Sequence, residues 1–139
     1  MIMVPYKAEH MLALQVQQAQ HGTFPCTPDY AKSAEGPQSW TALEGDEILG
    51  VGGVLAIWEG RGQVWSILGA GAGKHFKELH RACLKILADA PQRRLESDCV
   101  CAFPAGHKWL RMLGFHLEAA CARAYYPDGS DASLYSRVK

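Results

Sequence analysis

The sequence predicts a single mixed α/β domain built on one central sheet. The chain has 139 residues, a length that suits one hydrophobic core. Apolar stretches with a period of two alternate with stretches of period 3.6, and turns rich in glycine or proline separate them. The expected order is β–α–α–β–β–β–α–β–α–β–β, with about six to seven strands and about four helices in one domain over residues 1–139.

The first third of the chain predicts an edge strand followed by two helices. Ile2–Tyr6 is short and apolar, as expected of an edge strand. Lys7–Gln20 carries apolar residues near a 3.6-residue period, with glutamines on the other face, and Gly22 would end this helix. Thr27-Pro28-Asp29 would start a second helix that extends to Ala34.

The middle of the chain predicts a meander of three strands. The strands are expected at Ser39–Leu43, Glu47–Trp58 and Gln63–Leu68, with turn-forming residues between them. Gly50, Gly52 and Gly53 interrupt the second strand. Glycines inside a strand indicate a bulge or a close approach of neighbouring backbone.

The last part of the chain predicts two helices and three strands. In order these are a helix over Lys74–Ala88, a strand over Arg94–Ala102, a helix over Ala105–Leu113 and two strands over Phe115–Tyr126 and Ala132–Val138. Gly114 follows the second helix at a position where glycine commonly ends helices. Pro127–Ser130 forms the turn of the final hairpin.

The overall composition excludes several classes of function. Fourteen Lys and Arg balance fourteen Asp and Glu, so nothing predicts a nucleic-acid or anionic-membrane partner, for which a basic surface is needed. No apolar run approaches the roughly eighteen residues of a membrane span, and the N-terminus lacks the pattern of a signal peptide. We therefore expect a cytoplasmic protein.

The spacing of cysteines and histidines predicts no metal site. The five cysteines, an odd number without a disulfide framework, are typical of reduced thiols. Cys99 and Cys101 would point to one face of a strand and do not form a C-x-x-C pair. The six histidines include no H-x-x-x-H pair.

One motif carries chemistry: the stretch SILGAGAGKHF at Ser66–Phe76. Three glycines at alternate positions lie between a predicted strand and a predicted helix, and Lys74 and His75 follow them. Such turns often bind phosphate, because bare backbone N–H groups and a helix N-terminus attract anions. A Walker A loop is excluded, since its first glycine would fall on Leu68 and its Ser or Thr on His75. A dinucleotide-binding fingerprint is excluded because the glycines run G-x-G-x-G after a late strand.

This glycine turn and the order of elements resemble the GNAT superfamily of N-acetyltransferases over nearly the whole chain. The pyrophosphate loop of that family has the pattern R/Q-x-x-G-x-G/A, and Gly71-Ala72-Gly73 matches its G-x-G part. Trp109–Phe115 (WLRMLGF) is similar to the family's short helix ending in LGF, and the tail AYYPDGSDASLYSRV to its last two strands. The resemblance implies a GNAT fold, a mixed central sheet flanked by helices, and acyl transfer from acetyl-CoA to an amine.

The same resemblance implies which residues form the site. Acetyl-CoA or coenzyme A would be bound by Ile67, Leu68, Gly69, Gly71, Ala72, Gly73, Lys74 and His75. His107, at the start of the short helix, would lie near the thiol end of the cofactor and is the catalytic candidate. Tyr125 and Tyr126 would either line an acceptor cleft or pack within the sheet.

Two competing functions follow from departures from the family pattern. Leu68 stands where the pattern has Arg or Gln, Leu110 stands where many members have a tyrosine general acid, and Gln63–Leu68 has no glutamate to act as a base. The first hypothesis is an acyltransferase that acts on a small-molecule or protein amine. The second is a non-catalytic structural protein, because the chain also resembles small phage and prophage proteins related to an internal virion, or core-assembly, family of short-tailed phages.

The two hypotheses imply different partners and locations. An acyltransferase would work in the cytoplasm, whereas a structural protein would have virion proteins as partners, in the host cytoplasm or in the virion. Edge strands in this fold often pair, so a homodimer is compatible with both.

Overall fold

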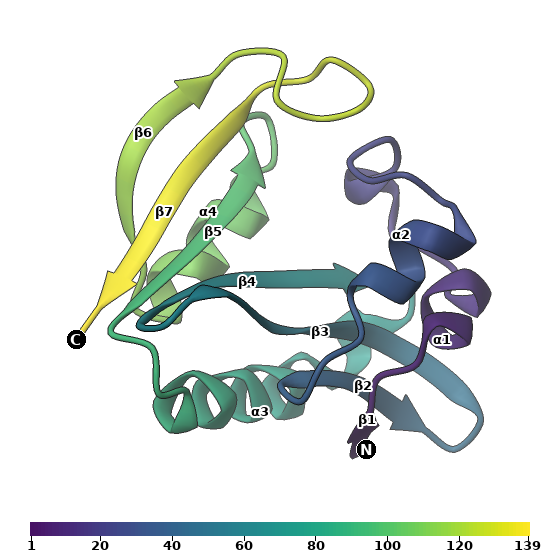
Figure 1. Cartoon of the computed structure of the whole chain (residues 1–139). Helices are drawn as coiled ribbons and strands as arrows, with labels where there is room; N and C mark the ends of the chain where they lie inside the picture. The colour runs from purple at the N-terminus through teal and green to yellow at the C-terminus, as the bar shows by residue number, and fades with distance from the viewer.

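The computed structural model describes residues 1–139 and contains one mixed sheet of seven strands in the order β1-β2-β3-β4-β5-β7-β6 (Figure 1). The strands are β1 (Ile2–Pro5), β2 (Ser39–Glu44), β3 (Glu47–Trp58), β4 (Arg61–Leu68), β5 (Arg94–Val100), β6 (His116–Ala122) and β7 (Ala132–Val138). The helices are α1 (Ala8–Ala13), α2 (Pro28–Ser33), α3 (Phe76–Asp89) and α4 (Pro104–Met112), with 3₁₀ turns η1 (Gln18–Gln20) and η2 (Ala72–His75). Seven strands and four helices confirm the predicted fold class.

The sheet divides into two halves at the contact between β4 and β5. Every other pair of neighbouring strands is antiparallel, whereas β4 and β5 are parallel and pair at three positions, ending at Gln63 and Glu96. Beyond this point the two strands diverge, as Figure 1 shows. Helix α3 lies in the crossover that a parallel pair requires. One half therefore consists of β1–β4 and the other of β5–β7.

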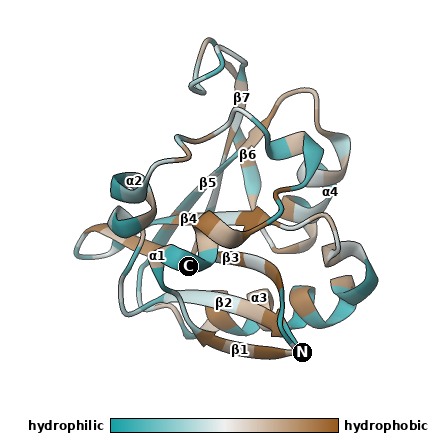
Figure 2. Cartoon of the chain, turned by 90° about the vertical axis from the view of Figure 1, so that its right-hand side faces the viewer, coloured by the Kyte–Doolittle hydropathy of each residue, from teal (hydrophilic) through white to brown (hydrophobic).

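Two large hydrophobic clusters cover the two faces of the sheet. One packs α3 and α4 against the sheet and includes Leu87, Leu95 and Phe115. The other packs α1 and α2 against β3 and β4 and includes Tyr6 and Ile67. Figure 2 shows the sequence pattern behind this packing on α3, where brown apolar and teal polar segments alternate along the helix.

The predicted helix over Lys7–Gln20 is wrong beyond its first two turns. Helix α1 ends at Ala13, and Val16 then forms an isolated antiparallel bridge with the glycine turn. The Gln17 N–H donates to the Leu68 carbonyl at 2.9 Å. Backbone pairing with the end of β4 therefore overrides the local helical preference, which is a weak determinant of structure.

The other differences lie at the ends of elements. Helix α2 begins after Thr27 as expected, and the Thr27 hydroxyl accepts a hydrogen bond from the Tyr30 N–H at 3.2 Å. The strand predicted over Phe115–Tyr126 ends at Ala122. Ala124 has a φ of 51°, a left-handed conformation that a strand does not contain.

The close backbone approach predicted at the glycines of β3 is confirmed. At Gly53 any Cβ would collide with the backbone carbonyl of Gln38, in the loop before β2. The Val54 N–H donates to the same carbonyl at 3.1 Å, so the two segments cannot separate without losing a hydrogen bond. The spacing here is one that glycine alone allows.

We expect Gly53→Ala to destabilise the fold by about 1–3 kcal/mol, the usual cost of overpacking, because the colliding atoms belong to backbone. The matched control is Gly73→Ala, since a Cβ at Gly73 would meet no atom within 4 Å. Its stability should stay the same or rise by about 0.4–1 kcal/mol. Chemical denaturation of both variants measures the difference, and equal midpoints would contradict this account of β3.

Candidate functional site

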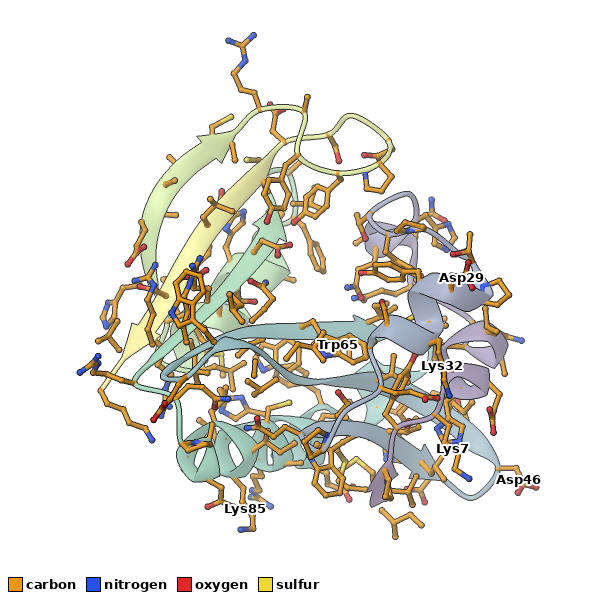
Figure 3. All side chains as sticks on the ribbon, in the orientation of Figure 1. Lys7, Asp29, Lys32, Asp46, Trp65 and Lys85 are labelled. Atoms are coloured by element: carbon orange, nitrogen blue, oxygen red, sulfur yellow. The ribbon has the colours of Figure 1, made fainter.

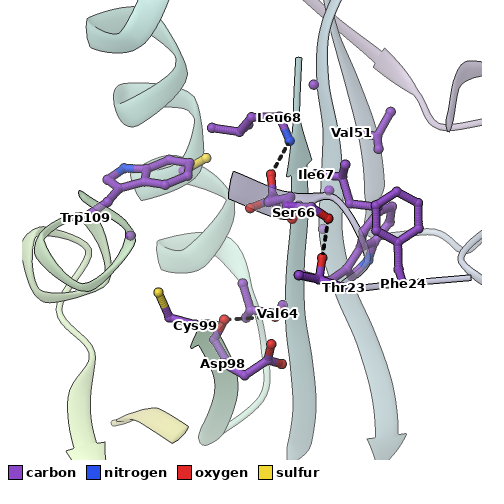
Figure 4. A pocket seen from close by; sticks show the side chains of 18 of the residues that line it. Thr23, Phe24, Val51, Val64, Ser66, Ile67, Leu68, Asp98, Cys99 and Trp109 are labelled. Carbon is purple, nitrogen blue, oxygen red and sulfur yellow. Dashed lines mark hydrogen bonds between the residues drawn. The ribbon is translucent and has the colours of Figure 1, made fainter. Parts of the chain in front are cut away.

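A cleft opens where β4 and β5 diverge. It has a volume of about 680 Å³ and is lined by both halves of the sheet, by α3 and α4, and by the η1–α2 and β6–β7 loops. Figure 4 shows its walls, with Ser66, Ile67 and Leu68 on β4 and with Asp98 and Cys99 on β5. Most lining side chains are apolar, and Asp98 is the sole lining residue that carries a formal charge at pH 7.

Asp98 is a largely buried carboxylate without a cationic partner. It accepts hydrogen bonds from the Tyr126 hydroxyl at 2.6 Å and from Gln63 Nε2 at 3.2 Å, and both donors are neutral. Burial raises the pKa of Asp98 above its ordinary value, although the two hydrogen bonds act in the opposite direction. Burial and the bond to Asp98 together raise the pKa of Tyr126, so its hydroxyl remains a donor at neutral pH.

Aromatic rings from the β6–β7 loop, the η1–α2 loop and α2 surround this carboxylate. Tyr125 meets Tyr126 edge to face, with ring centroids 5.2 Å apart. On the opposite wall Phe24 stacks on Tyr30 at 6.0 Å. Burial and then the charge of Asp98 raise the pKa of Tyr30, and the same two causes lead for Tyr125. The field of the carboxylate therefore reaches both walls of the cleft.

A backbone hydrogen bond joins the two loops across the outer end of the cleft. The Asp128 N–H, in the β6–β7 loop, donates to the Gly22 carbonyl at 3.1 Å. Gly22 has a φ of 77°, a conformation that favours glycine, and any Cβ there would press against the Asp128 carboxylate. This bond closes the loop end of the cleft.

The side chain of Gln20 occupies the free edge of β4. Its Nε2 donates to the Ser66 carbonyl and its Oε1 accepts from the Leu68 N–H, both at 2.8 Å (Figure 4 draws the second bond). A primary amide thus makes the two bonds that a neighbouring strand would make after β5 has diverged. Gln17 Nε2 donates to the same side-chain oxygen, Gln20 Oε1, at 2.9 Å.

The glycine turn contributes only part of its predicted residues to the cleft. Ile67, Leu68, Ala72 and Gly73 line it, whereas Gly69, Gly71, Lys74 and His75 do not. His75 Nδ1 lies 3.8 Å from a carboxylate oxygen of Glu44 and 3.7 Å from one of Glu78. A side chain at Gly71 would collide with the Glu47 carboxylate, and the Gly71 N–H donates no hydrogen bond within the chain.

Gly73 has no structural reason to be glycine. Its φ is not positive, and a Cβ would meet no atom within 4 Å. It lies in η2, the turn that leads into α3, and lines the cleft. Bare backbone at such a place gives a ligand close access to the start of a helix, where N–H groups favour anions.

His107, the predicted catalytic residue, lies outside the cleft lining. Its Nε2 is 3.0 Å from the Cys101 carbonyl and must donate to it, so Nδ1 accepts from the Tyr135 hydroxyl at 2.7 Å. Both ring nitrogens are therefore engaged, Nδ1 with β7 and Nε2 with the backbone that directly follows β5. The geometry gives His107 a structural role, and we do not include it in the chemistry below.

Two site residues, Gln20 and Asp98, were missed by the sequence analysis. Gln20 lay within a stretch with helical periodicity, and Asp98 was one polar residue in a strand of period two. The signal for Asp98 was available, since RLESDCVC places a carboxylate amid a strand that has to be half buried. Tyr125 and Tyr126 both line the cleft, which is one of the two arrangements predicted for them.

One buried donor in the cleft region lacks a partner. Trp65 lines the cleft, and its indole Nε1–H is buried without any hydrogen-bond acceptor. Buried polar groups are nearly always satisfied by protein, water or ligand.

The chain contains no group of three or more His, Cys, Asp or Glu side chains that could hold a metal ion. None of its helices is long and apolar enough to span a membrane.

No protein-family model and no curated protein sequence matches the chain. In fold it resembles the ribosomal-protein-S18-alanine N-acetyltransferase of Escherichia coli, with a TM-score of 0.75, 15% identity and coverage of 99% of this chain and 92% of that one. It also resembles a GNAT-family acetyltransferase of Streptococcus pneumoniae (TM-score 0.69, 14% identity, 99% of each chain). A third is a Bacillus subtilis acetyltransferase solved with CoA (TM-score 0.60, 14% identity, 73% of this chain and 76% of that one). At these identities the likeness shows the fold alone, and it confirms the GNAT-like fold.

We expect Asp98→Asn to raise the thermal midpoint at pH 7 and to lose this advantage near pH 4. Burial in the folded state raises the pKa of Asp98 above its ordinary value, so the folded state binds the proton more tightly than the unfolded chain does. Raising the pH through this range therefore costs stability, and asparagine removes the cost while its carbonyl still accepts from Tyr126. Asp46→Asn, in an exposed turn (Figure 3), is the control. An Asp98→Asn midpoint below that of the wild type at pH 7 would contradict this assignment.

Proposed function

We propose that the protein is an acyl-CoA-dependent N-acyltransferase that uses acetyl-CoA to acylate an amine. The observation that carries the proposal is the cleft between β4 and β5, which places bare backbone at Gly73 near one wall and a single carboxylate, Asp98, on the other. The fold shared with N-acetyltransferases, one of them solved with CoA, supports the same function.

The residues around the glycine turn fit a pyrophosphate. The turn from Gly71 to Lys74, which we call the phosphate cradle, has open space at Gly73 that any side chain would fill. The Gly71 N–H lacks an acceptor within the chain. Lys74 is exposed in the same turn and supplies a positive charge. We assign phosphate binding to Gly71, Ala72, Gly73 and Lys74, and we give His75 no direct role because Glu44 and Glu78 surround it.

The free edge of β4 fits the extended arm of an acyl-CoA, which carries amide groups. Ser66 offers a carbonyl and Leu68 an N–H, and both point into the cleft because Gln20 bonds them from that side. Once Gln20 leaves, the Leu68 N–H is also a donor that can stabilise negative charge on an acyl oxygen. We therefore infer that Gln20 has to move before the acyl donor binds.

The chemistry uses the carboxylate and the apolar walls of the cleft. A bound thioester supplies an activated acyl group and a good leaving group. Asp98 accepts a proton from the ammonium form of the acceptor, which frees the nitrogen lone pair for attack. Leu110 lines the cleft where a tyrosine acid stands in many family members, so the thiolate takes its proton from water. Loss of a general acid costs about 10²–10⁴-fold in rate and does not abolish the reaction.

The alternative is a non-catalytic assembly protein of phage type. Leu110 and the engaged nitrogens of His107 favour it, because neither residue can donate or accept a proton in the cleft. The solved structures it resembles are acetyltransferases and lend no support to a virion role. The unpaired carboxylate at Asp98 favours the enzyme, since a purely structural cleft has no use for a buried charge.

Acetyl-CoA is expected to raise the thermal midpoint of the protein. At a hundred times the dissociation constant, binding to the folded state adds about 2.7 kcal/mol, or roughly 8 °C for a domain of this size. Gly73→Leu should fold normally and lose most of this shift, because its side chain fills the phosphate cradle. Lys85→Ala, on the part of α3 that points away from the cleft (Figure 3), should keep it. No shift for the wild type at millimolar acetyl-CoA would overturn the proposed function.

Gln20→Ala should bind acetyl-CoA more tightly than the wild type, because it removes a competitor for the edge of β4. The free protein should lose about 1–2 kcal/mol of stability, since the three neutral hydrogen bonds of the Gln20 side chain disappear. Gln18→Ala is the control, because Gln18 is exposed and lies in the same 3₁₀ turn as Gln20. Titration calorimetry measures both affinities. A weaker affinity for Gln20→Ala would show that Gln20 helps to hold the ligand.

A further inference from the structure

We propose that the acceptor is a small monoamine with an apolar, aromatic body, selected by Asp98 and by the rings of Tyr30, Tyr125 and Tyr126. This inference rests on the proposed function and names its acceptor class. It combines three observations: the single charge in the cleft, the aromatic walls around that charge, and the backbone bond that closes the loop end.

The charge of the cleft defines the polar end of the acceptor. Asp98 is the only charged lining residue, and its hydrogen-bond donors, Tyr126 and Gln63, are neutral. The neighbouring carboxylate on the same face of β5, Glu96, is already paired with Arg61 and Arg94 at 2.6 Å each. One cation therefore completes the site. A second ammonium, as in a polyamine, would find no anion, and a carboxylate on the acceptor would meet Asp98 with no cation in the lining.

The walls of the cleft define the body of the acceptor. Tyr30 is 39% exposed and Tyr125 is 48% exposed, so both rings present uncovered surface beside the carboxylate. The rings stand on opposite walls, each supported by a second ring, Phe24 or Tyr126. Aromatic faces attract a cation held between them and pack well against another ring. A short aliphatic amine would leave this surface unused.

The closed loop end argues against a polypeptide acceptor. The bond between the Asp128 N–H and the Gly22 carbonyl ties the η1–α2 and β6–β7 loops together, so an extended chain would have to break this bond to lie across the cleft there. Peptide groups entering the cleft would also meet mostly apolar side chains and leave their hydrogen bonds unmade. A small molecule satisfies both constraints.

The reaction with such an acceptor balances without another co-reactant. Asp98 takes one proton from the ammonium, the amine nitrogen forms a bond to the acyl carbon, and the carbon–sulfur bond breaks. The second nitrogen proton and the thiolate charge are balanced through solvent. The product is a neutral amide, which no longer pairs with Asp98 and can therefore leave the site.

The test compares 2-phenylethylamine with ethylamine, spermidine and a tripeptide with a free N-terminus. Thiol release with acetyl-CoA gives kcat/KM for each, and quenching of tryptophan fluorescence measures binding of the amine alone. We expect 2-phenylethylamine to exceed every other acceptor by at least tenfold. Asp98→Asn should reduce its kcat/KM at least a hundredfold and its binding at least tenfold, whereas Asp46→Asn should change neither. Tyr125→Ala should narrow the gap between 2-phenylethylamine and ethylamine.

Separate outcomes identify which claim fails. If acetyl-CoA stabilises the protein but spermidine, ethylamine or the tripeptide is the best acceptor, the acceptor inference is overturned and the proposed function stands. The inference is also overturned if Asp98→Asn binds 2-phenylethylamine as the wild type does. If the amine binds in an Asp98-dependent way and acetyl-CoA does not bind, the amine site is supported and the proposed function fails.

Discussion

The divergence of β4 and β5 is the constraint on which the rest of the structure depends. Two parallel strands that pair at three positions and then separate leave backbone groups without a strand partner. Each such group costs free energy unless something else bonds it. The Ser97 hydroxyl bonds the Val64 carbonyl, the Gln20 amide bonds Ser66 and Leu68, and the Gln17 backbone completes the edge. The segment after α1 is not helical because it makes these bonds to β4. The edge of the cleft therefore determines the conformation of a segment that is far from β4 in the sequence.

The two carboxylates on one face of β5 have different surroundings. Glu96 has two arginine partners at 2.6 Å, whereas Asp98, two residues later, has none. Paired charges of the first kind hold elements together. A buried charge without an opposite charge, of the second kind, costs stability, and such perturbed groups are found preferentially at functional sites. The position where β4 leaves β5 lies between the two, so the same divergence that ends the pairing exposes Asp98 to the cleft.

Local signals predicted most of the fold, and long-range contacts explain what they missed. The hairpins, the glycine turn and the helix before Gly114 have turn chemistry and periodicity that act within a few residues. Gln20 bonds Leu68, a residue 48 positions away, and a periodic stretch contains no sign of that. His107 was predicted to be catalytic from its place at the start of the short helix, yet Tyr135, 28 residues later, occupies one of its nitrogens. Asp98 could be seen as a carboxylate in a strand, but its exposure depends on where β4 ends its pairing.

The single bond between Gly22 and Asp128 has a mechanical consequence. The two halves of the sheet are joined at the three pairs between β4 and β5 and again, across the cleft, by this bond. Because the cleft is held at both ends, where the strands pair and where the loops are joined, its width is restricted. A ligand as thin as a flat ring leaves the bond between Gly22 and Asp128 in place, whereas a thicker ligand has to break it first. Breaking it costs about 1 kcal/mol, so the bond weakens the binding of a wide ligand by this amount, while the paired ends of β4 and β5 stay together.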